Sequence, residues 1–151
     1  MFKSRFILRN VVAGAICLVG VMLFSGCKDK GNGIGTLGKT AKLAPPAWIQ
    51  GKWGAEGIEV FKFTSDDVFT MGVSLKTIWN YNVGVSSVSL KETKNTSSLY
   101  EITITAKAMG QESVSGYYSF KKGDGTYIEA ASNETGTPLT NDDYGRLDKI
   151  N

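Results

Sequence analysis

The sequence predicts an all-β fold, a small antiparallel up-and-down β-barrel of about eight strands. From Ile58 onward, apolar and polar residues alternate with a period of two, which is typical of strands that bury one face. Turn-forming residues lie between these segments, most clearly at Lys122-Gly123-Asp124-Gly125, and such short links join neighbouring antiparallel strands. Because a meander with one apolar face would expose its edge strands, we expect the sheet to close into a barrel.

The strand pattern is clearest at residues 98–106, where Tyr100 and Ile102 share one face and Glu101 and Thr103 lie on the other. No segment repeats its apolar residues with the period of a helix beyond a turn or two. The segments that we assign to strands are, in order, 58–63, 68–72, 77–83, a strand around Val88 and Leu90, 98–106, 113–120, 125–131 and 145–150.

The N-terminal segment has the composition of a secretory signal peptide. Lys3, Arg5 and Arg9 precede an unbroken run of 14 apolar or glycine residues at 11–24. A membrane-spanning helix needs about 20 such residues, so this run is too short to cross a bilayer. A basic start, a short apolar helix and the small residues after it predict that residues 1–26 are a signal peptide.

The stretch Leu23-Phe24-Ser25-Gly26-Cys27 resembles the lipobox of bacterial lipoproteins, although that family usually has leucine where this chain has Phe24. The resemblance implies that Cys27 becomes the N-terminus of the mature chain, carries diacylglyceryl and palmitate, and anchors the protein in the membrane of the cell envelope. Lys28 after the cysteine implies the outer membrane if the bacterium is Gram-negative. The alternative is an ordinary cleaved signal peptide with an incidental cysteine.

Residues 33–40, GIGTLGKT, match the P-loop pattern that binds nucleotide phosphates. A working P-loop joins a buried strand to a helix, whereas here only a few residues separate the match from Cys27, and Pro45 and Pro46 follow it. We therefore expect no nucleotide binding. Residues 27–44 are instead predicted to be the lipidated cysteine and a flexible Gly/Lys-rich tether, which leads to one domain at 45–151.

The composition argues against catalysis and against nucleic-acid binding. The chain has no histidine, and its two cysteines are Cys17, inside the predicted signal peptide, and Cys27. These absences exclude serine–histidine and cysteine–histidine nucleophiles and most zinc sites, so we expect no enzyme, no metal and no cofactor. Paired carboxylates could still catalyse glycoside hydrolysis. The candidate aspartate pairs, at 66–67 and 142–143, lie in stretches typical of turns. The predicted domain has 10 basic and 13 acidic residues, without the basic patch of a nucleic-acid-binding protein.

The triplet Gly51-Lys52-Trp53, close after Trp48, resembles the G-x-W motif of lipocalins. In that family the tryptophan closes one end of the barrel, and a basic side chain from near the C-terminal end of the domain stacks across it. The resemblance implies a lipocalin-like barrel in which Arg146, the only arginine after Cys27, stacks on Trp53. Trp48, Gly51, Trp53 and Arg146 would then form a structural plug. The domain is shorter than a standard lipocalin and lacks the later motifs, which leaves less room for a ligand.

Two functions fit this sequence. In the first, the lipid-anchored barrel binds a small apolar molecule among its inward aromatic and aliphatic residues. The candidate ligand-binding residues are Trp79, Tyr81, Tyr100, Ile102, Tyr118 and Phe120. The same side chains would fill a small barrel as ordinary core. In the second, a structural lipoprotein binds another envelope protein or a host molecule, and outward-pointing Trp79 and Tyr81 would favour it.

Overall fold

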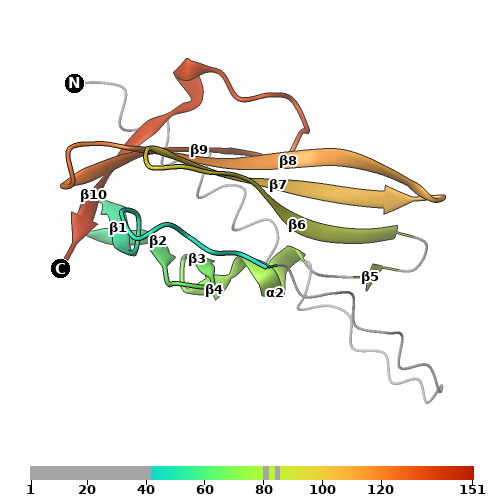
Figure 1. Ribbon diagram of the computed structural model, residues 1–151, viewed down its shortest axis with the longest axis horizontal. Helices are drawn as coiled ribbons and strands as arrows, with labels where there is room; N and C mark the ends of the chain where they lie inside the picture. Colours follow the sequence, from blue (N-terminus) through green and yellow to red (C-terminus); the bar gives the residue numbers. More distant parts are fainter. Residues whose placement is uncertain (1–41, 80–81, 84–85) are drawn as a thin grey trace, which may run out of the picture.

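The computed structural model describes residues 42–79, 82–83 and 86–151 (Figure 1). The predicted signal peptide, Cys27, Tyr81 and nearly all of the predicted tether lie outside the described residues. Within them the chain is all-β, as predicted, and none of the described helices is long and apolar enough to span a bilayer. The strands are β1 Gly51–Ala55, β2 Ile58–Phe63, β3 Val68–Thr70, β4 Val73–Ser74, β5 Asn82–Val83, β6 Ser86–Asn95, β7 Leu99–Ala108, β8 Gln111–Lys122, β9 Tyr127–Asn133 and β10 Gly145–Ile150.

The described sheet has ten strands, where about eight were expected. Residues 51–55 form β1, and residues 73–74 form the separate short strand β4 after a tight turn. The strand predicted at 77–83 is wrong in its first half, because Leu75–Trp79 is the helix α2. Leu75 is fully buried and Ile78 packs against the same core, which is the spacing of one face of a helix.

The strands follow the predicted up-and-down order, and the sheet curls into a half-barrel (Figure 1). Strands that follow one another in the chain pair with each other, except that β4 does not pair with β5. The ladder between β1 and β10 joins the first strand of the chain to the last. The edges of the described sheet are therefore β4 and β5. The helix α2 connects these edges and packs against β3, β4 and β6. Full closure by strand pairing, which we expected, is absent from the described residues, and α2 lies at the gap.

Two β-bulges change which side chains face inward. In β2, Trp53 pairs with Phe61 and Gly54 with Glu59, so Val60 has no partner in the ladder, and Val60 and Phe61 are both buried. In β8, the register with β7 shifts at Ser115. The alternation in 113–120 predicts Val114 on the same face as Tyr118 and Phe120, whereas this bulge leaves Val114 42% exposed.

The hydrophobic core fills the inner side of the curl. It draws on the helix α2 and on every strand from β1 to β10 except β4 and β5, and it includes Leu43 and Ile49, which precede β1. The largest buried side chains are Trp53, Phe61, Tyr100 and Phe120, with Ile49, Leu75, Ile102, Ile104 and Ile128 around them. A core in which large aromatic rings meet aliphatic side chains buries much apolar area in a small domain.

Residues 42–50 form a strap that runs from the region of α2 toward the start of β1 (Figure 1). Leu43 and Ile49 of this strap are buried in the core. The backbone of Ala44 is held from both sides, since its N–H donates to Glu92 Oε2 at 2.8 Å and its carbonyl accepts from Asn95 Nδ2 at 2.7 Å. The folded domain, predicted to begin at Pro45, therefore includes Leu43 and Ala44.

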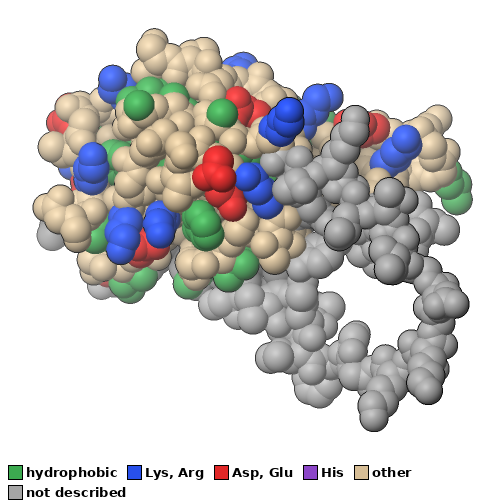
Figure 2. Space-filling model, turned by 60° about the horizontal axis from the view of Figure 1, so that its bottom comes forward, with side chains coloured by type: hydrophobic (Ala, Val, Ile, Leu, Met, Phe, Trp, Pro, Cys, Tyr) green, Lys and Arg blue, Asp and Glu red, His purple; other side chains and the backbone are tan. Residues whose placement is uncertain are grey.

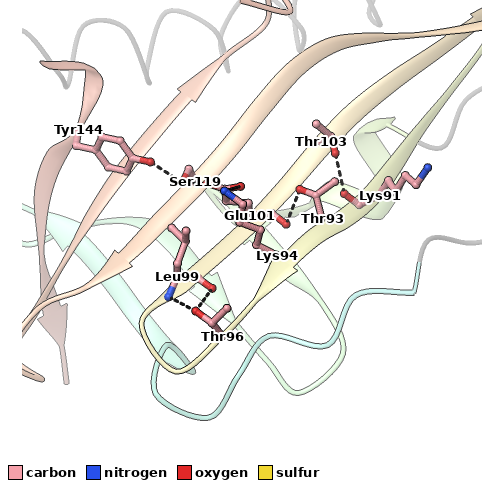
Figure 3. A network of polar contacts seen from close by, with 9 residues as sticks. All are labelled: Lys91, Thr93, Lys94, Thr96, Leu99, Glu101, Thr103, Ser119 and Tyr144. Atoms are coloured by element: carbon pink, nitrogen blue, oxygen red, sulfur yellow. Dashed lines mark hydrogen bonds and ion pairs between the residues drawn. The ribbon is translucent and has the colours of Figure 1, made fainter. Parts of the chain in front are cut away.

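The outer face of the long strands carries a polar network (Figure 3). Ser119 is 2% exposed, and its hydroxyl lies 2.6 Å from the Tyr144 hydroxyl and donates to Glu101 at 3.3 Å. Glu101 in turn forms an ion pair of 3.1 Å with Lys94. Lys121 lies 3.6 Å from the centre of the Tyr144 ring, a cation–π contact. These contacts hold the end of the 134–144 loop over the outside of the sheet.

Candidate functional site

The candidate site is the aromatic interior, where rings from three strands meet. The centre of the Phe120 ring lies 5.1 Å from that of Phe61 and 4.9 Å from that of Phe63, and both pairs are edge-on. Tyr100 stacks on Phe120 with centres 6.3 Å apart, and Tyr118 meets Phe61 edge-on at 6.3 Å. Edge-on and offset arrangements at these distances are favourable, so the rings stabilise one another directly.

Four of the predicted ligand-binding residues are brought together here. Tyr100, Ile102 and Phe120 are fully buried, and Tyr118 is 8% exposed. They occupy the space that an apolar ligand would have to enter. The side chain of Trp79, at the end of α2, and the whole of Tyr81 lie outside the described residues.

Phe61 and Phe63 were not predicted as site residues, although both lie at the centre of the ring cluster. They belong to the strand predicted at 58–63, and their spacing of two residues was a sufficient signal for a shared inward face. The rings of β7 and β8 therefore pack against rings of β2, from the opposite side of the curl.

Tyr100 supplies a polar group at the edge of this apolar cluster. Its hydroxyl donates to Glu92 Oε2 at 3.0 Å, the same carboxylate oxygen that accepts from the Ala44 N–H. Burial of the phenol, together with the negative charge of Glu92, raises the pKa of Tyr100 above its ordinary value of 10.0. Tyr100 thus links the aromatic interior to the carboxylate that holds the strap.

This raised pKa predicts a loss of stability in alkali. In the unfolded chain Tyr100 ionises near pH 10.0, while in the folded protein it keeps its proton to higher pH. The unfolded state then binds fewer protons, so stability is fully present below pH 10 and falls above it, by up to about 1.4 kcal/mol per pH unit. Urea unfolding of the wild type between roughly pH 9 and pH 11 should show this fall in the free energy of unfolding with pH. Tyr100→Phe should reduce it, and an unchanged slope in Tyr100→Phe would contradict the assignment.

Of the predicted plug residues, Trp53 is the most deeply buried. Trp53 is 1% exposed, and its indole N–H donates to the Ile49 carbonyl at 2.6 Å. The predicted contact of Arg146 with Trp53 is wrong: the Arg146 guanidinium lies 4.2 Å from the centre of the Tyr127 ring and binds Asp148 at 2.8 Å. The basic group near Trp53 is Lys149, at 5.5 Å from the ring centre.

The period of β10 explains this exchange. Leu147 is buried, so Lys149, two residues later, shares its face and is paired directly with Trp53 across the β1–β10 ladder. Arg146 has the opposite parity and is exposed beside Tyr127, on the neighbouring strand β9. The basic side chain over the tryptophan is therefore Lys149 and not Arg146.

The other two plug residues have structural roles at the same end of the curl. Trp48 is half-buried, and its indole N–H donates to the Thr96 carbonyl at 2.9 Å, which ties the strap to the β6–β7 turn. Gly51 has a φ of +123°, a conformation that other residues rarely adopt. It begins β1 at the point where the chain turns from the strap into the sheet.

The described ranges contain no group of three or more histidine, cysteine, aspartate or glutamate side chains arranged to hold a metal ion. The acidic pair at 66–67 instead forms a local turn with Thr64. The Thr64 hydroxyl donates to Asp66 at 3.0 Å and accepts from the Asp67 N–H at 3.0 Å.

Comparison with known proteins gives no relative: no family model, no curated protein and no solved structure matches this chain. The arrangement of its own side chains is therefore the basis for a functional proposal.

Proposed function

We propose that this chain is a non-catalytic lipoprotein of the bacterial cell envelope, anchored through lipid on Cys27, whose filled barrel serves as a structural or protein-interaction module. The observation that supports this choice over ligand binding is the packing of Phe120 and Tyr100. Both are fully buried and stacked on each other. A ligand among these rings would have to displace side chains whose contacts already stabilise the domain.

We also propose that the barrel is lipocalin-like. This proposal is supported by the buried Trp53 at one end of the curl and by the basic side chain of Lys149 that approaches the ring from the last strand. The domain differs from a closed lipocalin barrel in its ten described strands and in the helix α2, which lies between β4 and β5. These departures favour a packed variant with little internal space.

The test is the mass of the mature protein, purified in mild detergent from a Gram-negative host that expresses the full chain. We expect a chain that begins at Cys27 and carries a covalent lipid mass, with no small molecule retained under native conditions. Cys27→Ser should lose the lipid and leave the membrane fraction. Photo-crosslinking of the wild-type lipoprotein in intact membranes should yield a discrete adduct with an envelope protein.

Two outcomes would redirect the proposal. A reproducible non-covalent mass that dissociates as a fatty acid, sterol-like or pigment molecule would make the protein a ligand carrier. A mature chain without covalent lipid would remove the anchor, and the protein would be a secreted domain with an incidental cysteine.

A further inference from the structure

The tip of the β7–β8 hairpin is the feature that the filled barrel leaves unexplained. Strands β7 and β8 pair as far as Ala108 and Gln111, whereas β9 ends its pairing with β8 at Tyr117. On that side the hairpin extends past its neighbour, whereas on the other side β6 stays paired with β7 as far as Ala108. The tip of the hairpin lies at one end of the molecule (Figure 1). Met109 lies at its tip and is 96% exposed, the largest value among the exposed hydrophobic residues of the described chain.

The turn that carries Met109 holds a methionine in the left-handed region, as the turn at Met71-Gly72 also does. Met109 and Gly110 have φ angles of +52° and +83°, which is the pattern of a two-residue type I′ turn. The first position of such a turn favours asparagine, aspartate or glycine, because other side chains are strained in the left-handed region. Since almost all of Met109 is exposed, packing within the described domain does not compensate for this strain.

The surroundings of the tip are polar but electrically balanced. Lys107 and Glu112 face each other across the hairpin, and Glu112 also lies 4.0 Å from Lys91. Residues 107–114 are all exposed. They carry one positive and one negative charge, so the tip is neither attracted to nor repelled from a charged surface as a whole. Figure 2 shows hydrophobic side-chain surface, with charged groups beside it, at the projecting end of the molecule.

The size of this apolar tip indicates its partner. A specific protein interface buries roughly 1,200 Å² or more, far more than a single methionine can supply. A bilayer surface has no minimum interface of this kind, because binding there scales with the apolar area that enters the boundary between headgroups and acyl chains. A lipid anchor would also hold the tip close to the bilayer, so that even a weak contact is populated.

The length of the tether allows this contact. Lys42, the first described residue, follows Cys27 by 42 − 27 = 15 positions. At about 3.3–3.6 Å per residue, 15 residues span at most about 50–54 Å, so the anchor would keep the domain within that distance of the bilayer.

We propose that the β7–β8 tip, through Met109, inserts into the headgroup region of the membrane that holds the lipid anchor and so fixes the orientation of the domain. This inference rests on the lipid anchor in the proposed function. Lys107, beside the tip, would keep its ammonium group at the level of the lipid phosphates, as lysines near an interface do.

The test uses the full chain, processed and lipidated in the cell, with Met109→Cys. Because Cys17 would leave with the signal peptide and the Cys27 sulfur would be blocked as a thioether to diacylglycerol, the new cysteine is the only free thiol and takes an environment-sensitive fluorophore. The matched control is Ser97→Cys in the exposed turn between β6 and β7, at the opposite end of β7. Both proteins are placed in vesicles of phosphatidylethanolamine and phosphatidylglycerol and floated on a density gradient.

The expected result is flotation of both proteins, with a blue-shifted emission at position 109 that spin-labelled lipids quench, and neither change at position 97. Flotation with equal, water-like emission at both positions would overturn the membrane contact and leave the anchor intact. A shift at position 109 that requires added envelope protein would overturn it in favour of a protein partner. Failure to float would show that the anchor itself is absent and would overturn both proposals.

A second pair of variants keeps the proposal testable if Met109→Cys fails to fold. Met109→Asn places a residue that suits the turn at the same position, and we expect it to raise the midpoint of urea unfolding. With the fluorophore moved to Gln111→Cys in the Met109→Asn background, the blue shift expected for Gln111→Cys alone should be lost. Retention of that shift in the Met109→Asn background would contradict the role of the methionine.

Discussion

Replacing Phe120 by alanine should lower the free energy of unfolding by about 3–5 kcal/mol. Phe120 is fully buried in β8, and its ring contacts Phe61, Phe63 and Tyr100. The loss has two parts, the removal of buried apolar surface and the cavity left behind. Because the neighbouring rings belong to β2 and β7, on different sides of the curl, they cannot easily move together to fill it. Urea unfolding followed by tryptophan fluorescence measures the change.

The control for this substitution lies on the same strand. Val114 is 42% exposed, so Val114→Ala should change the free energy of unfolding by less than about 0.5 kcal/mol. The comparison tests whether the interior is filled by its own rings or has room for a ligand. If Phe120→Ala cost no more than Val114→Ala, the interior would not be filled by its own rings, and the ligand-binding function would regain its support.

The fold was predictable where turn residues bound a short apolar-rich run. The strands predicted at 58–63 and 145–150 coincide with β2 and β10 for this reason, although the bulge at Val60 interrupts the alternation in β2. The segment at 77–83 was not predictable in this way. The alternation predicts Trp79 and Tyr81 on the inward face of a strand and Ile78 on the other face. In the structure Leu75 and Ile78, three positions apart, share one face of a helix that contacts β3 and β6.

The candidate site was predictable in its rings and not in its polar contacts. Tyr100, Tyr118 and Phe120 share an inward face by simple period-two counting, and they do meet in the core. The contact of a basic residue with Trp53 depends on register between β1 and β10, which the sequence alone does not define. Arginine is the better partner for an indole, yet parity places Arg146 on the outside and Lys149 beside the ring.

The start of the domain was missed for a related reason. Leu43 and Ala44 follow a Gly/Lys-rich stretch and precede two prolines, so composition assigns them to the tether. Their place in the fold depends on Glu92 and Asn95, about fifty positions later, which hold the Ala44 backbone through side-chain hydrogen bonds. Contacts of this kind leave no periodic pattern in the sequence.

Replacing Glu92 by alanine should therefore reduce the free energy of unfolding by about 2–4 kcal/mol. The Glu92 carboxylate accepts hydrogen bonds from the Ala44 N–H, the Tyr100 hydroxyl and Asn95 Nδ2, at 2.8, 3.0 and 3.0 Å. Its loss leaves the phenol of Tyr100 at the edge of the core without this acceptor, and a buried unpaired donor is costly. It also frees the strap on the side of Ala44, so the Ala44 amide should exchange faster with deuterium.

A double-mutant cycle separates these two effects. In Glu92→Ala/Tyr100→Phe the unpaired phenol no longer exists, so the double variant should lose less stability than the sum of the single variants. Fast exchange at Ala44 should persist in the double variant, because the phenol has no part in holding the strap. Glu112→Ala, which removes an exposed carboxylate 4.0 Å from Lys91, should change little and serves as the control for charge. If Glu92→Ala left both stability and the protection of Ala44 unchanged, the burial of Leu43 and Ile49 alone would hold the strap, and Glu92 would have no structural role.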